Sequence, residues 1–209
     1  MRTYWNENVG SFAGTVLDEP EFSHENHGED YFRLPLQVLR LSGAEDILPV
    51  LVSRTQLEQL PVHTGDRLGV AGEIRSFNNR SGCGSRVVLT VFARQITPAE
   101  GEDWNQVALA GVLCKKPVYR RTPLGREICD LTLAVNRRYG RSDYLPCIAW
   151  GAVARTCACL DVGDAIRLEG RFQSRGYTKN VDDQVIHRTA YEVSIMSMQR
   201  LVTPLFAGE

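Results

Sequence analysis

The chain has 209 residues, a hydrophobic fraction of 43% and a formal net charge of −1. This length allows one large domain or two small ones with their own cores, and the composition excludes an intrinsically disordered chain. No apolar run approaches the roughly 18 residues that cross a bilayer, and the first residues lack a signal-peptide pattern, so we expect a cytoplasmic protein.

The charges are unevenly distributed along the chain. Residues 1–103 carry 9 Arg, no Lys and 15 acidic residues, a balance of −6. Residues 104–209 carry 15 Lys plus Arg and 10 acidic residues, a balance of +5. We therefore expect a polyanion to be attracted to the second half of the chain.

The chain contains an internal repeat. A shift of 97 positions aligns its two halves without a gap over more than forty residues. The paired positions include Asn8 and Asn105, Gly14 and Gly111, Gly28 and Gly125, Leu34 and Leu131, Val38 and Val135, Asp46 and Asp143, and, after one inserted residue, Gly72 and Gly170. We predict two copies of one domain, residues 1–100 and residues 104–209, with a polar connection at residues 97–103.

The two copies predict the same elements in the same order. The first copy reads as strand Val9–Leu17, a variable turn, an alternating strand through Leu34–Val38, strand Ile47–Val52, helix Thr55–Leu60, a strand from Asp66 to Ile74, a long turn and strand Val87–Ile96. The second copy reads as strand Val107–Cys114, a variable turn, a strand through Leu131–Val135, strand Tyr144–Trp150, helix Val153–Leu160, a strand from Asp164 to Phe172, a long turn and strand Ala190–Met196.

Five strands with a short helix between the third and the fourth are typical of the OB-fold, a partly open Greek-key barrel. The sequence therefore predicts an all-β protein made of two tandem OB-fold barrels. Gly72 and Gly170, each inside a fourth strand, match the bend that closure of such a barrel requires. An antiparallel sandwich is the alternative that the strand pattern leaves open.

Aromatic and basic residues alternate over residues 136–150, which read NRRYGRSDYLPCIAW. Rings stack on unpaired bases and guanidinium groups neutralise phosphates, so this pattern suits a single nucleic-acid strand. An ordinary hairpin with buried rings and a solvated basic turn is an equal interpretation of this stretch alone.

The second copy resembles the bacterial single-stranded DNA-binding protein (SSB) family over about residues 104–200. The motifs that carry the resemblance are NQVALAGVLCKKP, DLTLAVNRRYGRSDY, CIAWG, GDAIRLEGRFQSRGY and RTAYEVS. The first copy is similar to the family only through its likeness to the second. The resemblance implies a non-enzymatic protein that binds and protects single-stranded DNA, without strong sequence preference, in replication, recombination or repair.

The resemblance also implies site residues. The family's base-stacking positions fall on Tyr139, Tyr144, Trp150 and Tyr177. The basic residues along the implied groove are Arg137, Arg138, Arg141, Arg171, Arg175 and Lys179, and Lys115, Lys116, Arg120, Arg121 and Arg126 extend it. The first copy has Ser42, Ile47 and Ser53 at the corresponding ring positions, so we expect an architectural role for it.

Two properties of the family bear on assembly and partners. Typical members form four-barrel assemblies, which two chains of this kind would supply as a homodimer. They also end in an acidic, hydrophobic tip that recruits replication or repair proteins. This chain ends in LVTPLFAGE, which puts recruitment through such a tip in doubt.

Other functions remain open from the residues. An adaptor of the PriB type would bind a primosome or mobile-element protein tightly and single-stranded DNA weakly, and an OB-fold also serves RNA. His24 and His27, or Asp182 and Asp183, would mark a metal site or a nuclease only with further ligands nearby, and we expect no metal and no cofactor. The six cysteines are expected to be buried, reduced thiols of a cytoplasmic, nucleoid-associated protein.

Overall fold

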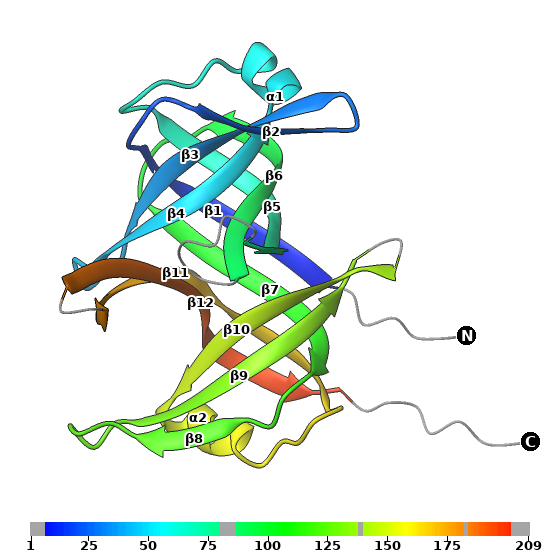
Figure 1. The fold of residues 1–209 in the computed structure, drawn as a ribbon, viewed down its shortest axis with the longest axis vertical. Helices are drawn as coiled ribbons and strands as arrows, with labels where there is room; N and C mark the ends of the chain where they lie inside the picture. Colours follow the sequence, from blue (N-terminus) through cyan, green and yellow to red (C-terminus); the bar gives the residue numbers. More distant parts are fainter. Residues whose placement is uncertain (1–6, 80–86, 138–139, 182–183, 202–209) are drawn as a thin grey trace, which may run out of the picture. The chain divides into compact units, whose positions relative to one another are not determined.

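The computed structural model describes residues 7–79, 87–137, 140–181 and 184–201, with the side chains of residues 179–181, 184 and 186 left undescribed. The chain forms two compact units (Figure 1). The N-terminal unit comprises Val9–Val107 and Arg171–Glu192, and the C-terminal unit comprises Met1–Asn8, Ala108–Gly170 and Val193–Glu209. Because contacts place 171–192 with the N-terminal unit, the linear domains 1–100 and 104–209 stay a proposal from the sequence.

The N-terminal unit contains a closed sheet. Its elements are β1 Glu7–Val16, β2 Glu21–Asn26, β3 Glu29–Leu39, β4 Glu45–Ser53, α1 Arg54–Gln59, β5 Arg67–Asn78 and β6 Val87–Pro98. The strand order is β2-β3-β4-β6-β5-β1, and β1 also pairs with β3. This extra pairing closes five strands into a barrel with the helix between the third and fourth, as in the OB-fold.

The C-terminal unit repeats this plan. Its elements are β7 Trp104–Leu113, β8 Val118–Arg121, β9 Glu127–Asn136, β10 Ser142–Trp150, α2 Gly151–Cys157, β11 Ala165–Val181 and β12 Gln184–Arg200, of which residues 104–107, 171–181 and 184–192 belong to the N-terminal unit. The strand order is β7-β11-β12-β10-β9-β8, closed by the pairing of β7 with β9. The all-β, two-barrel prediction is confirmed, and closure in both units excludes the open sandwich.

Two predictions about connections were wrong. The variable turn after the first strand is an additional strand in each unit, β2 or β8, which forms a hairpin with the next strand. In the N-terminal unit this hairpin turns at His27 and Gly28, whose φ angles of 55° and 77° match a tight type I′ turn. The long turn predicted after Phe172 is the far part of two 17-residue strands, β11 and β12.

Barrel closure explains four glycines. A Cβ atom at Gly72 would clash with the carbonyl oxygen of Phe92, and one at Gly170 would clash with that of Ser194. Gly14 and Gly111 approach the backbone of β3 and β9 equally closely. The prediction that Gly72 and Gly170 serve closure is confirmed, because only glycine allows these strands to pack so tightly.

The helix α1 begins with a capping box. The hydroxyl oxygen of Ser53 accepts a hydrogen bond from the backbone N–H of Gln56 at 3.2 Å, and the N–H of Ser53 donates to Gln56 Oε1 at 2.9 Å. These two bonds satisfy backbone groups that the first helical turn leaves unpaired. Ser53 therefore has a structural role at the position where the second copy carries Trp150.

Replacing Ser53 by alanine should lower the free energy of unfolding of the N-terminal unit by about 0.5–2 kcal/mol, because the cap is lost. Chemical denaturation followed by circular dichroism measures the change. Ser11→Ala, on an exposed position of β1, is the control and should change the stability very little. Equal stabilities of the two variants would contradict the capping role.

The cysteines are only partly as predicted. Cys129, Cys147 and Cys157 are buried and free, and burial raises the pKa of Cys129 to about 11 and that of Cys157 to about 12. Cys159 is exposed, because it lies just beyond the end of α2. The prediction of buried thiols is thus confirmed for three residues, holds only in part for the half-buried Cys114 and is wrong for Cys159, while Cys83 lies outside the described residues. Neither helix within the described ranges is long and apolar enough to span a membrane.

Candidate nucleic-acid interface

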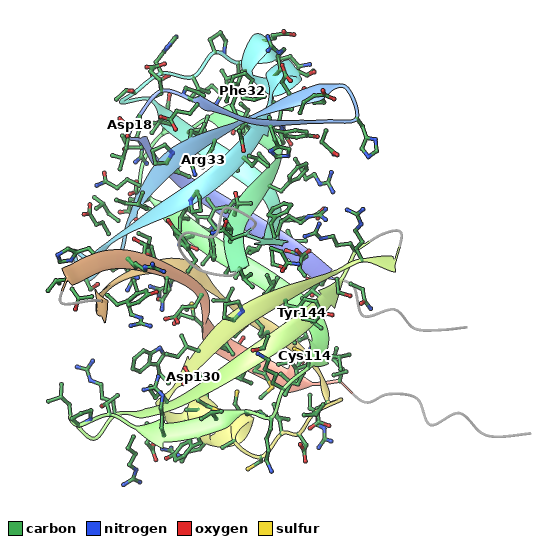
Figure 2. All side chains as sticks on the ribbon, viewed as in Figure 1. Asp18, Phe32, Arg33, Cys114, Asp130 and Tyr144 are labelled. Atoms are coloured by element: carbon green, nitrogen blue, oxygen red, sulfur yellow. The ribbon has the colours of Figure 1, made fainter. Side chains whose placement is uncertain are left out.

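Strand β10 divides its residues between the barrel interior and an outer face. Asp143, Leu145, Cys147 and Ala149 point inward and are buried. The alternate residues, Tyr144, Pro146, Ile148 and Trp150, therefore lie on the other side of the strand, where Ile148 is itself buried. Tyr144 is 53% exposed and Trp150 is 41% exposed, so both rings meet solvent (Figure 2 labels Tyr144).

Neighbouring strands complete this outer face. In the register of β9 and β10, Ala134 lies opposite Tyr144, Thr132 opposite Pro146, Asp130 opposite Ile148 and Ile128 opposite Trp150. On the other side, β12 runs parallel to β10 and places Ser194 beside Ile148. We call this side the ring face; it comprises Tyr144, Pro146, Ile148 and Trp150 of β10, Ile128, Asp130, Thr132 and Ala134 of β9, and Ser194 of β12. Ile128 and Ile148 among them are buried.

The local backbone explains why Trp150 stands at the end of the ring face. Trp150 keeps the extended conformation of the strand, with φ −124° and ψ 146°, and is also the N-cap residue of α2. Gly151 follows with a φ of 55°, a value that favours glycine. The chain therefore turns from strand to helix directly after the ring, which accounts for the sequence Ala-Trp-Gly.

Arg137 has a structural partner inside the C-terminal unit. Its Nε donates to Asp143 Oδ2 at 2.6 Å, and its Nη2 donates to Asp143 Oδ1. The Asp143 side chain is fully buried and that of Arg137 is 15% exposed. Arg40 and Asp46 form the same pair, at 2.7 and 2.6 Å, 97 residues earlier. A phosphate contact by Arg137 stays a prediction.

The other predicted basic residues differ in their surroundings. Arg141, directly before β10, is exposed and forms no ion pair within the described residues, and the same holds for Lys115, Lys116 and Arg126 of the first turn region. Arg120 is paired with Asp130 and Arg121 with Glu127. Arg138 and Tyr139 lie outside the described residues.

The remaining predicted residues lie on the far part of β11, which belongs to the N-terminal unit. Tyr177 and Arg171 are partly buried, and Arg175 is exposed with its Nε 3.9 Å from a carboxylate oxygen of Glu192. The side chain of Lys179 is outside the described part. Among the predicted stacking rings that the structure describes, Tyr144 and Trp150 lie on one side of one strand in one unit.

The N-terminal unit carries rings that the sequence did not predict as a cluster. Tyr31 of β3 lies 5.6 Å from Phe92 of β6 between ring centroids, and Arg94 stands over Phe92 at 5.0 Å. This cluster was not predicted because the site positions of the first copy were taken from the rings of the second copy, which has no rings at the positions of Tyr31 and Phe92. At the positions predicted from the second copy, Ser42 and Ile47 are exposed and Ser53 caps α1.

The histidine pair considered as a metal site forms another arrangement. The ring of His24 stacks on Tyr31, with centroids 5.2 Å apart and planes 16° apart. Within the described ranges, no three His, Cys, Asp or Glu side chains gather closely enough to hold a metal ion. Asp182 and Asp183 lie outside those ranges.

Comparison with known proteins supports the resemblance found in the second copy. The model of the single-strand binding protein family matches residues 104–201. The chain is 36% identical over 81 residues to single-stranded DNA-binding protein B of Bacillus subtilis, covering 35% of this chain and 72% of that protein. It is also 36% identical over 80 residues to single-stranded DNA-binding protein 2 of Listeria innocua, covering 35% of this chain and 50% of that protein. The chain spans about half the length of the first curated relatives it matches.

Solved structures extend the similarity to both copies. The wild-type single-stranded DNA-binding protein of Thermus aquaticus matches with a TM-score of 0.78 and 25% identity, covering 96% of each chain. A deletion mutant of that protein matches with a TM-score of 0.74 over 97% of this chain and 98% of the other. The family model, the coverage of the Bacillus relative and the shared two-barrel fold agree, and the chain belongs to the single-strand binding protein family.

Proposed function

We propose that this protein is a non-enzymatic single-stranded DNA-binding protein that protects unpaired strands in replication, recombination or repair. The observation that carries the proposal is the ring face. Tyr144 and Trp150 are exposed on one side of β10, whose other side is buried in the core. An exposed ring adds little to the stability of a barrel, whereas it offers a stacking surface to a base.

The spacing of the two rings suits an extended strand. They are six residues apart on β10, which is roughly 20 Å at the rise of a strand. One base cannot stack on both rings, so successive nucleotides would run along the ring face. Tyr139 and Tyr177 stay predicted as further stacking positions.

Cations beside the ring face would neutralise the phosphates. Arg141 directly precedes the strand that carries both rings, and neither it nor Lys115 or Lys116 is neutralised by an ion pair among the described residues. Arg138, Arg171, Arg175 and Lys179 stay proposed as additional phosphate contacts. Cationic grooves with stacking platforms bind strands with little sequence preference.

The affinity for poly-dT should fall steeply with salt concentration. Neutralising a phosphate on a single strand releases counterions and contributes a slope of about −0.7 to the log–log plot of affinity against salt. Three or four such contacts predict a slope of about −2 to −3. Titrations of the full chain by tryptophan fluorescence at several salt concentrations measure it, and a flat salt response would contradict the electrostatic part of the proposal.

Several predictions rest on this proposed function. They are the homodimer with four barrels, a nucleoid-associated location in the cytoplasm, contacts with replication or repair proteins and an architectural role for the N-terminal barrel. Competition between matched DNA and RNA oligomers distinguishes the proposal from an RNA-binding function. Tight binding of a protein partner together with weak binding of DNA would indicate an adaptor instead.

A further inference from the structure

The two copies carry opposite charges on one equivalent segment. Residues 18–29 contain five acidic residues and no Lys or Arg, whereas residues 115–126 contain five Lys or Arg and no acidic residue. The shift of 97 positions that relates the copies aligns these segments and reverses the sign of charge at Asp18 and Lys115, Glu19 and Lys116, and Glu29 and Arg126. We call residues 18–29 the acidic edge and residues 115–126 the basic edge.

Each of these segments contains an edge strand. Strand β2 of the acidic edge pairs with β3, and strand β8 of the basic edge pairs with β9 (Figure 1). Within the described ranges neither has a second neighbouring strand, and every residue of both is exposed. The backbone N–H and C=O groups on the outer side of such a strand can pair with a strand of another chain.

Both edge strands also expose apolar side chains. Phe22 of β2 is 61% exposed, and Tyr119, at the equivalent position of β8, is 39% exposed. Val118, beside Tyr119, is 58% exposed. Pairing of either strand with another chain would remove part of this apolar surface from water, which favours association.

The charges decide which edges can meet. Lys115, Lys116 and Arg126 form no ion pair among the described residues, and the same holds for Asp18 and Glu25. Two acidic edges repel each other, and so do two basic edges, whereas an acidic edge attracts a basic edge. A contact between two copies through these strands must therefore join unlike edges.

We propose that the acidic edge is a docking surface for the basic edge of a second copy of this chain, with β2 of one copy beside β8 of the other. The contact is heterologous, because different surfaces of the two copies meet. Each chain has one edge of each sign, so the contact can repeat from copy to copy. This inference concerns association between copies and does not depend on the DNA-binding function proposed above.

Exchange of equivalent residues between the two edges tests the inference. The acidic-edge variant carries Asp18→Lys and Glu19→Lys, and the basic-edge variant carries Lys115→Asp and Lys116→Glu. A third variant carries all four changes and so keeps the composition and net charge of the unaltered chain. All four residues are exposed, and Glu19 accepts a hydrogen bond from the Thr64 N–H at 2.9 Å, so circular dichroism is used to verify the fold of each variant.

Sedimentation velocity of the full chain without DNA, over a range of protein concentrations at low salt, measures the association. Low salt is used because exposed charges are screened within about 10 Å at 0.1 M. A homodimer held by another surface would remain in every variant, so only the further association is compared. The single exchange of Asp18→Lys or Lys115→Asp, at residues without an ion pair among those described, gives a second and milder pair of variants.

The unaltered chain should associate further as its concentration rises, and the acidic-edge and basic-edge variants should each do so at least about tenfold more weakly, because both edges of each variant have the same sign. An equimolar mixture of these two variants should regain the association, and so should the four-residue variant, since unlike edges meet again. Absence of further association in the unaltered chain would overturn the inference. A mixture that associates no more than its components would overturn it as well.

Discussion

Replacing Arg137 by methionine should lower the free energy of unfolding of the C-terminal unit by about 3–5 kcal/mol. The fully buried carboxylate of Asp143 would lose the guanidinium that donates two hydrogen bonds to it. A buried charge without its partner costs far more than the pair contributes when intact. Chemical denaturation followed by circular dichroism measures it.

Arg141→Met is the matched control for Arg137→Met. Arg141 lies four residues further on, is exposed and forms no ion pair with the described residues, so its loss should change stability by less than about 0.5 kcal/mol. Its loss should weaken DNA binding instead. If Arg137→Met kept the stability of the unaltered protein and lost only DNA affinity, the structural assignment of Arg137 would be wrong.

Removing the rings of the ring face should cause the largest loss of DNA affinity. Tyr144→Ala and Trp150→Ala should each weaken binding of a dT oligomer by about 1–3 kcal/mol, the contribution of one stacked base. Because the rings are well separated on β10, their effects should add in the double variant. Fluorescence anisotropy of a labelled oligomer is the suitable measurement, since it does not depend on the tryptophan that is removed.

Trp104→Ala controls for the general loss of an exposed tryptophan. Trp104, at the start of β7, is 52% exposed, comparable with Trp150. Its replacement should leave DNA affinity unchanged, and Trp150→Phe should retain most of the affinity because a ring remains. Equal losses in Trp104→Ala and Trp150→Ala would remove the reason to place the strand on the ring face.

The sequence predicted the barrels because their signals are periodic and occur twice. The alternation of Leu34, Leu36 and Val38, repeated at Leu131, Leu133 and Val135, reports a buried side of each second strand, and all six side chains are buried. The hairpin strands β2 and β8 were missed because their residues are exposed throughout. A strand without a buried side has no apolar alternation, so its pattern resembles that of a polar turn.

The candidate site was predictable in its rings and less so in its charges. The parity of β10 places Tyr144 and Trp150 on one side as soon as Leu145 and Cys147 are assigned to the core. The sequence around Asp143 does not show that this side chain is buried and forms an ion pair with Arg137. The usable signal was the repeat, since an arginine followed six residues later by an aspartate occurs in both copies, at Arg40 and Asp46 as well. Because the first copy has the same arginine–aspartate pair but lacks the rings, the pair indicates a structural function and not a DNA contact.

Photo-cross-linking to a dT oligomer that contains 5-iodouracil tests most directly whether a strand lies on the ring face. The bound complex is irradiated and digested with trypsin, which cuts after Arg141 and Arg155 and releases residues 142–155 with both rings. The account predicts cross-links in this peptide at Tyr144 or Trp150, lost in the double alanine variant. Efficient cross-links confined to other peptides, with none in residues 142–155, would contradict it.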